Sequence, residues 1–305
     1  MQPEAVQAAQ SLQSQFNWMS WMIILAYVVF TTWLGHKLSG RQATIKDFFL
    51  GGRKLPWWAV SGSVIATEIS AMTLVGVPAF LWAETGNMAY MVLGIGSVIS
   101  RVIVGLYFVP AYYEREIYSP YEYIGQKLGT RAQRVTSSLF MIGGSLGQGT
   151  RVLLTAMVAH VVTDLNIYTC IWLVGLVAVL WTYIGGIVTV IWTDVIQFFI
   201  FLFSALVTLY AVGAVLMQNG ISVGEMINAA HSAGKFHWLN FSWDFRQNYT
   251  IWAAVIASSI GGLNAYGVDQ MMVQRCFCCK GPKEARKAII WSSIGQLIMI
   301  ICLFV

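Results

Sequence analysis

The chain places hydroxyl groups and one carboxylate in the middle of an otherwise apolar stretch. Residues 57–80 are long enough to span a membrane as a helix, yet Thr67, Glu68, Ser70 and Thr73 lie at their centre. A charged group at mid-bilayer costs roughly 2.5–3.5 kcal/mol, so such residues usually face a cavity or a partner. Oxygen atoms are the ligands that a hard cation prefers. The pattern therefore indicates an oxygen-lined site within the membrane.

The same stretch is predicted to be a broken helix. Gly76 and Pro78 follow the polar residues, and proline removes a backbone donor and clashes with the preceding turn. An unwound segment leaves carbonyl groups that protein, water or an ion must satisfy within lipid. Residues 249–272 are also rich in Gly, Ser and Asn. Two broken spans at corresponding positions of inverted halves indicate a solute-binding site, although small residues in 249–272 also allow close helix packing.

Two arginines fall inside predicted spans. Arg151 follows a run of small residues, 143–150, that must face protein. Its guanidinium could hold the carboxylate of a solute through two hydrogen bonds, or it could form a structural ion pair with Glu68. Arg101 lies nearer the inner end of its helix, where its side chain could extend to the membrane surface. We expect Arg101 to have a structural role.

The composition excludes several function classes. Hydrophobic residues make up 57% of the 305 positions and charged residues only 10%, against about 25% charged in globular domains. The net charge of +5 does not indicate a nucleic-acid partner, because the location of Lys and Arg matters more than their sum. The sequence contains no P-loop and no HExxH, and we expect neither an enzyme nor an organic cofactor. We expect the cluster Cys276, Cys278 and Cys279 to be incidental.

Eight apolar segments are predicted to span the membrane. They cover residues 18–35, 57–80, 88–110, 134–163, 168–189, 192–217, 249–272 and 286–305. The loops after the first, third and seventh segments carry most of the Lys and Arg residues, and only Lys235 and Arg246 lie in loops on the opposite side. The positive-inside rule then places the N-terminal tail, 1–17, outside the cell. The last segment is still apolar at Val305, so we expect a fragment of a longer protein.

Several long motifs resemble the sodium:solute symporter family from about Asp47 to the last residue. In chain order they are Phe48–Trp58, the polar centre of 57–80, Ser119–Gly129, Thr182–Gln197, Asp269–Arg275 and Lys283–Arg286. The resemblance implies an all-α polytopic membrane protein with a LeuT-type inverted-repeat fold. Residues 18–35 would form an extra helix, 57–217 the first five-helix repeat, and 249–305 the truncated start of the second. It would lie in a plasma or inner membrane.

The resemblance also implies a sodium site. In this family, carbonyl groups of the first core helix bind sodium together with a carbonyl and hydroxyls of the eighth. The first set matches Ala66 and Ile69, whereas the second set would lie beyond Val305. We therefore expect the 305-residue chain alone not to transport. Asp194 matches the aspartate of the family motif Thr-Asp-x-x-Gln, which is linked to the sodium pathway, and we expect it to be an unpaired carboxylate that attracts cations.

The matches to substrate-binding positions favour a small organic anion. The positions that bind hexose in the family's sugar transporters hold Gly94, Gly262, Ala265 and Gln296 here, so a hexose is not expected. Arg151, Ser70 and Thr73 match the members that carry sialic acid, which favours an acidic sugar or another carboxylate. Glu68 stands where the family often has a neutral residue. It could offset Arg151, bind a coupling cation or favour a cationic group on the solute.

The resemblance thus predicts sodium-coupled symport of a small solute by alternating access, with sodium and lipid as the other partners. One alternative is a proton-coupled carrier that uses Glu68 as the proton site. Another is a transporter-like sensor domain of a longer signalling protein.

Overall fold

The computed structural model describes residues 16–39, 44–83, 86–244 and 246–304, and these residues form helices joined by loops. The predicted external tail, 1–17, lies almost entirely outside the described residues. The longer helices are α2 (Trp18–Ser39), α4 (Trp57–Glu68), α5 (Ala71–Trp82), α6 (Leu93–Ile103), α9 (Thr130–Thr163), α10 (Ile167–Gln218) and α14 (Pro282–Phe304). The shorter helices are α3 (Ile45–Leu50), α7 (Val109–Tyr113), α8 (Pro120–Leu128), α11 (Val223–Ser232), α12 (Ser259–Gly267) and α13 (Gln270–Phe277).

The predicted break in 57–80 is confirmed, but it lies earlier than Gly76 and Pro78. Helix α4 ends at Glu68, and Ile69 and Ser70 are extended, with ψ of 120° and 171°. The N–H of Ser70 donates to the Thr73 hydroxyl at 3.3 Å, as in a helix cap, so a new helix begins at Ala71. Pro78 lies inside α5. The capping residues, and not the proline, therefore set the position of the break.

Four other predicted segments differ in detail from the structure. Segments 168–189 and 192–217 form the single helix α10, whose kink lies inside the first segment at Gly186, where φ is 57°, a left-handed conformation that glycine adopts without steric cost. Segment 88–110 begins with a 3-10 turn, η2 (Met88–Val92), and contains a π-helical turn, η3 (Val104–Phe108). Segment 249–272 is divided into a π-helical turn, η4 (Ala253–Ser258), then α12, and finally the start of α13. The residues rich in Gly, Ser and Asn are thus helical, and the chain leaves the helix only at Val268 and Asp269.

Four helical stretches in the described part of the chain are long and apolar enough to cross a membrane. They are Trp18–Gly35, Met88–Tyr113, Gly186–Gln218 and Pro282–Leu303. Helix α10 contributes a shorter apolar stretch, Ile167–Trp181, before its kink. Helices α4 and α5 are each too short alone. Eight spans therefore remain a prediction.

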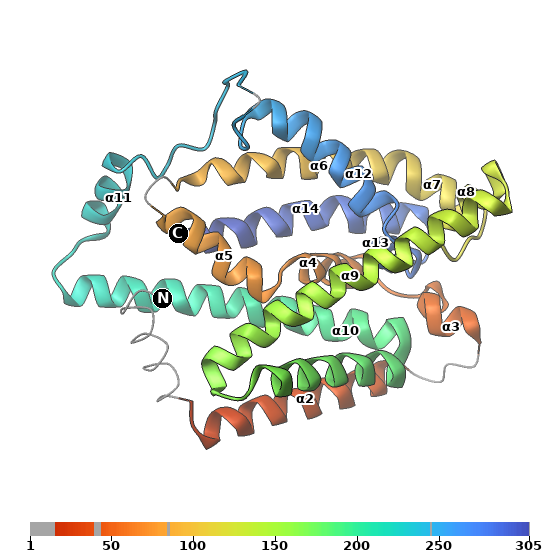
Figure 1. Cartoon of the computed structure of the whole chain (residues 1–305), viewed down its shortest axis with the longest axis horizontal. Helices are drawn as coiled ribbons and strands as arrows, with labels where there is room; N and C mark the ends of the chain where they lie inside the picture. The colour runs from red at the N-terminus through yellow and green to blue at the C-terminus, as the bar shows by residue number, and fades with distance from the viewer. Residues whose placement is uncertain (1–15, 40–43, 84–85, 245, 305) are drawn as a thin grey trace.

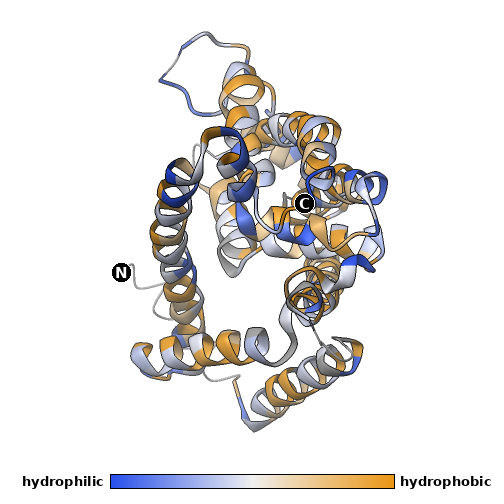
Figure 2. Ribbon diagram, turned by 90° about the vertical axis from the view of Figure 1, so that its right-hand side faces the viewer, coloured by the Kyte–Doolittle hydropathy of each residue, from blue (hydrophilic) through white to orange (hydrophobic). Residues whose placement is uncertain are grey.

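The helices are arranged around α4, α10 and α14 (Figure 1). Helix α4 packs against both α10 and α14, and their buried side chains form the main core, including Val60, Val64, Ile191 and Ile289. Helix α9 lies across α5 and α10, and α2 packs along α10. Hydrophobic residues recur along the long helices, as the orange bands in Figure 2 show. Large exposed side chains such as Trp82 (88% exposed) agree with lipid or further protein around the bundle.

Candidate functional site

The break between α4 and α5 interrupts the helical hydrogen bonds of the backbone at the predicted sodium ligands, Ala66 and Ile69. The N–H of Ile69 still donates to the Ile65 carbonyl at 3.1 Å, but the N–H of Ser70 turns to Thr73. In a continuous helix Ser70 would donate to the carbonyl of Ala66. The Ala66 carbonyl therefore lacks the partner that a continuous helix would give it, and it can bind another group. Ala66 and Ile69 are both buried, so a cation held there would be shielded from water.

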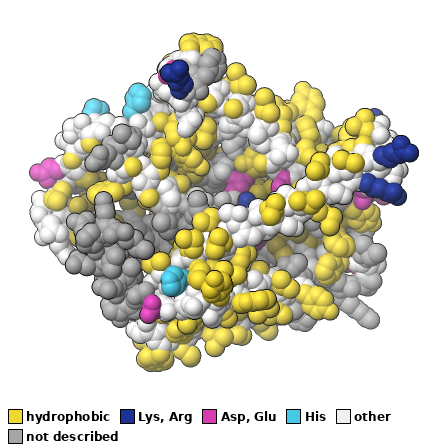
Figure 3. Space-filling view, viewed as in Figure 1, with side chains coloured by type: hydrophobic (Ala, Val, Ile, Leu, Met, Phe, Trp, Pro, Cys, Tyr) yellow, Lys and Arg dark blue, Asp and Glu magenta, His cyan; other side chains and the backbone are white. Residues whose placement is uncertain are grey.

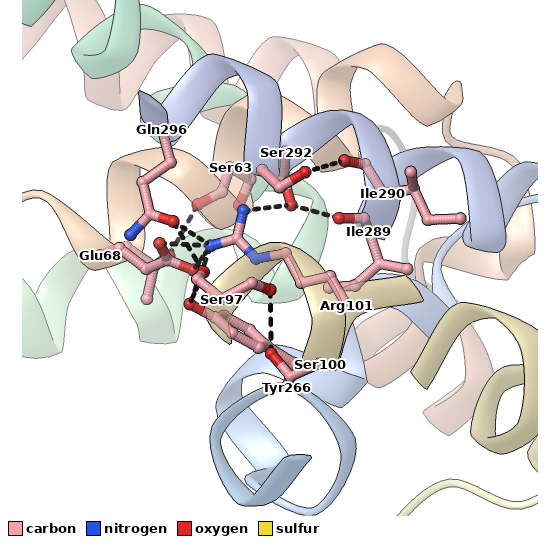
Figure 4. A network of polar contacts seen from close by, with 12 residues as sticks. Ser63, Glu68, Ser97, Ser100, Arg101, Tyr266, Ile289, Ile290, Ser292 and Gln296 are labelled. Carbon is pink, nitrogen blue, oxygen red and sulfur yellow. Dashed lines mark hydrogen bonds and ion pairs between the residues drawn. The ribbon is translucent and has the colours of Figure 1, made fainter. Parts of the chain in front are cut away.

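The last residue of α4, Glu68, forms a buried ion pair with Arg101 of α6. Both carboxylate oxygens of Glu68 accept hydrogen bonds from Nη2 of Arg101, at 2.5 and 2.6 Å (Figure 4). The Arg101 side chain is 0% exposed and that of Glu68 is 11% exposed. The C-terminal end of α4 carries a partial negative charge, which disfavours a carboxylate there. The guanidinium of Arg101 offsets both this end charge and that of Glu68.

Arg101 also joins α6 to two further helices. It donates to the Ser292 hydroxyl at 3.0 Å, to the Tyr266 hydroxyl at 2.9 Å and to Oε1 of Gln296 at 2.8 Å. Its guanidinium carbon lies 4.2 Å from the centre of the Tyr266 ring, a cation–π contact. Ser97 of α6 completes the network through hydrogen bonds to Tyr266 and Gln296, both at 3.1 Å. One guanidinium thus links α4, α6, α12 and α14.

Two sequence-based expectations about the arginines are wrong. Arg101 does not extend to the membrane surface, because it lies at the centre of the network with no exposed atoms. The partner of Glu68 is Arg101, so Glu68 does not form the ion pair with Arg151 that we considered. A structural role for Arg101 agrees with its four hydrogen-bonded neighbours.

A second ion pair lies at the other predicted acidic position. Oδ2 of Asp194, on α10, accepts from the Ser63 hydroxyl at 2.6 Å and from Nη2 of Arg275 at 3.1 Å. Nε of Arg275 donates to the same Ser63 hydroxyl at 2.9 Å, so the three side chains form a closed triangle between α4, α10 and α13. The expectation that Asp194 is an unpaired carboxylate is therefore wrong.

The structure does not bring Arg151 into contact with Ser70 or Thr73. Arg151 is exposed on α9 and makes no hydrogen bond or ion pair through its side chain within the described part of the chain. Ser70 and Thr73 lie at the break, where they cap α5. Helix α9 packs against α5, so these residues belong to neighbouring helices. Figure 3 shows acidic and basic atoms at the middle of a mostly apolar face crossed by α9.

Small residues in 249–272 serve close packing. The hydroxyl of Ser258 donates to the Leu93 carbonyl at 3.0 Å. A side-chain carbon added to Gly267 would lie 2.9 Å from the Phe108 ring, so these helices approach closely. Of the positions that bind hexose in the family's sugar transporters, Gln296 is occupied by the Arg101 network. Close packing of helices thus explains why 249–272 is rich in Gly and Ser, and no second binding site is needed to explain it.

The three neighbouring cysteines are buried structural residues. The Tyr113 hydroxyl donates to the carbonyls of Cys276 (2.8 Å) and Cys279 (3.0 Å), which fixes this turn. Burial raises the pKa of the Cys276 thiol to about 12, so the metal-binding thiolate is disfavoured. Within the described ranges, no three His, Cys, Asp or Glu side chains are placed to hold a metal ion.

Sequence reasoning missed most members of the two networks. Ser97, Tyr266 and Ser292 are common residue types in helices, and nothing in their spacing marks them. Arg275 offered the best signal, because it ends the motif that begins at Asp269. Its partner Asp194 is 81 residues away, so only the fold reveals the pair.

The chain is similar in sequence to known membrane transporters. The model of the sodium:solute symporter family matches residues 48–305. The human sodium/iodide cotransporter is 28% identical over 272 residues, which cover 88% of this chain and 41% of the relative. The sodium-coupled monocarboxylate transporter 1 of Xenopus laevis is 30% identical over 267 residues, which cover 86% and 41%. The chain thus spans about 41% of the length of these relatives.

A solved structure of a sodium-coupled sialic acid symporter, in a substrate-bound outward-open state, superposes with a TM-score of 0.85. It is 24% identical in sequence, and the match covers 95% of this chain and 60% of that one. This agreement confirms the predicted all-helical LeuT-type fold.

Proposed function

Since this chain belongs to the sodium:solute symporter family, whose members are transporters and not enzymes, we propose that it forms part of a sodium-coupled symporter of a small solute. The observation that carries the proposal is the break at Ile69 and Ser70. It supplies buried carbonyl groups where the family resemblance places sodium, at Ala66 and Ile69. We further propose that 57–217 form the first repeat, that 249–305 open the second, and that the N-terminus lies outside.

The charges around the break favour an anionic solute. Arg101 neutralises Glu68 and Arg275 neutralises Asp194. Arg151 is then the intramembrane cation for which the described residues provide no acidic partner. A carboxylate can bind a guanidinium through two hydrogen bonds. The relatives carry iodide, monocarboxylates and sialic acid by their names, and all three are anions. We therefore propose a carboxylate-bearing substrate or acidic sugar held by Arg151, Ser70 and Thr73.

Coupling to sodium would arise from a difference in affinity between two conformations. A cation at Ala66 and Ile69 would hold the ends of α4 and α5 in the arrangement seen here, next to the hydroxyls of Ser70 and Thr73. Sodium can favour one conformation only by as much as it binds that conformation better. The membrane potential adds about 2.3 kcal/mol per charge per 100 mV. Proton coupling through Glu68 is less consistent with the structure, because a transported proton would have to break the pair with Arg101.

Thermal stability of the purified full-length protein tests this proposal. It is measured in sodium and in potassium, with a panel of carboxylates and neutral sugars. A ligand at 100 times its Kd stabilises the native state by about 2.7 kcal/mol, which raises the melting temperature. We expect a carboxylate to stabilise the protein in sodium only, and Arg151→Ala to abolish this effect.

The matched control is Arg134→Ala, which removes an exposed arginine from the same helix, α9, close to its start. It should leave the ligand effect intact. Stabilisation that is equal in sodium and potassium would contradict the symport proposal. Stabilisation by a carboxylate that survives Arg151→Ala would contradict only the substrate site.

A further inference from the structure

A lysine in the loop after α11 caps the far end of the broken helix. Nζ of Lys235 donates to the carbonyl oxygens of Leu81 at 2.9 Å, Ala83 at 2.7 Å and Gly86 at 3.0 Å. The backbone carbonyl of Lys235 in turn accepts from the N–H of Met88 at 2.9 Å. Figure 1 shows the chain after α11 passing the end of α5 that lies away from α4. The two segments are about 150 residues apart in sequence but are joined by four hydrogen bonds.

The chemistry of this contact is well matched. The last carbonyl groups of a helix have no partner within the helix, and they carry its partial negative charge. An ammonium group has three donors and no acceptor, so three carbonyls use its whole capacity. Leu81 lies in the last turn of α5, Ala83 caps it, and Gly86 lies just beyond. Lys235 therefore satisfies both the hydrogen bonds and the end charge of α5.

A second contact fixes the same end of α5. The Phe80 ring packs edge-on against Tyr249, with the ring centres 5.3 Å apart, and lies 6.2 Å from Tyr90. Tyr90 belongs to η2, and Tyr249 lies at the other end of the loop that carries Lys235, just before η4. At its opposite end, α5 is joined to α4 only through the extended residues Ile69 and Ser70. Helix α5 also packs against α9 and α14, while Lys235 and the two tyrosines hold its far end.

We infer that Lys235 is a positioning residue that latches the outer half of the broken helix, α5, to the loop that follows α11. While the latch is closed, α5 keeps the position in which the carbonyls of Ala66 and Ile69 face the break. Opening the latch frees the end of α5 to move independently of α4. The structural role of Lys235 does not depend on the proposed function, whereas its effect on transport rests on that function.

Hydrogen–deuterium exchange of the full-length protein in lipid tests the latch directly. The variant Lys235→Met keeps the length of the side chain and removes its donors. We expect amide exchange in residues 86–89 and at the end of α5 to quicken about tenfold or more, because the loop that carries the carbonyl partner of the Met88 N–H is no longer tied to α5 by Nζ. Arg246→Met is the matched control, since it removes an exposed cation from the same loop. Equal exchange in the two variants would overturn the inference.

Transport kinetics supply a readout that a merely structural contact would not change. We expect Lys235→Met to change the maximal rate of sodium-driven uptake about fivefold or more, with the half-saturating solute concentration held within about twofold. A loss of thermal stability with unchanged maximal rate would overturn the positioning role. If the wild-type protein shows no sodium-driven uptake, the proposed function fails, while the exchange experiment still decides whether Lys235 holds α5.

Discussion

Removing both members of the Glu68–Arg101 pair should destabilise the protein by less than the sum of the two single losses. Neither side chain can regain water without opening the bundle, because they are 11% and 0% exposed. Breaking a buried ion pair costs about 3–5 kcal/mol, since one charge remains without a partner. Arg101→Met also removes one hydrogen bond each from Tyr266, Ser292 and Gln296. We therefore expect a loss of about 5 kcal/mol for Arg101→Met and about 3 kcal/mol for Glu68→Gln.

The double variant separates the charge effect from the loss of packing. Glu68→Gln combined with Arg101→Met leaves no unpaired charge at the end of α4. Residues in direct contact have coupling energies of up to about 3 kcal/mol. With a coupling of about 3 kcal/mol, the double variant should lose about 5 kcal/mol and be no less stable than Arg101→Met alone.

The assay is equilibrium unfolding of the purified protein in mixed micelles. Lys287→Met is the control, because Lys287 forms a solvent-exposed pair with Glu284 at 3.4 Å. It should change the free energy of unfolding by less than about 1 kcal/mol. The reasoning would be refuted if the losses of Glu68→Gln and Arg101→Met simply added in the double variant. A loss for Arg101→Met as small as that of the control would refute it as well.

The other expectations concern packing, the second ion pair and the buried thiols. Arg275→Met leaves the Asp194 carboxylate with only a serine hydroxyl, and the same unfolding assay should show a loss of about 3 kcal/mol; a loss below about 1 kcal/mol would contradict this. In Gly96→Ala the new Cβ lies 2.6 Å from the side chain of Ser258, and the free energy of unfolding should fall by about 2 kcal/mol. In Gly143→Ala the new Cβ meets open space, and the free energy of unfolding should rise by up to about 1 kcal/mol. Equal effects of the two substitutions would contradict the close packing at Gly96. Because burial raises the pKa of Cys276 to about 12, maleimide labelling at pH 8 should be at least about a hundredfold slower in folded than in denatured protein, and fast labelling of folded protein would show that the thiol is accessible.

The broken helix was predictable because its signal is local. Four polar side chains at the centre of an apolar span indicate that the span does more than cross the membrane. The exact position was not predictable from Pro78, which lies within α5. A Ser and a Thr spaced three residues apart form a cap, and this local hydrogen bonding interrupts α4 before the proline is reached.

The pairing of the charges was not predictable, because it depends on how distant helices cross. Glu68 and Arg101 are 33 residues apart, and Arg151 was an equally reasonable partner by sequence. Asp194 and Arg275 are 81 residues apart and lie on α10 and α13. Residue types restrict which pairs can form, but the packing of α4 against α10 and α14 decides which ones do.

The pairing changes how a cation would be attracted to the break. Glu68 lies between the predicted ligands Ala66 and Ile69 in sequence, and as a free carboxylate it would draw any cation towards them. Arg101 cancels that charge, and Arg275 cancels the charge of Asp194. The attraction must then come mainly from carbonyl dipoles, whose effect depends on their direction and falls off quickly with distance. Cation binding would therefore be sensitive to the orientation of α5 relative to α4. This dependence connects the two ends of α5, because contacts at its far end help to set the geometry of the carbonyls at its near end.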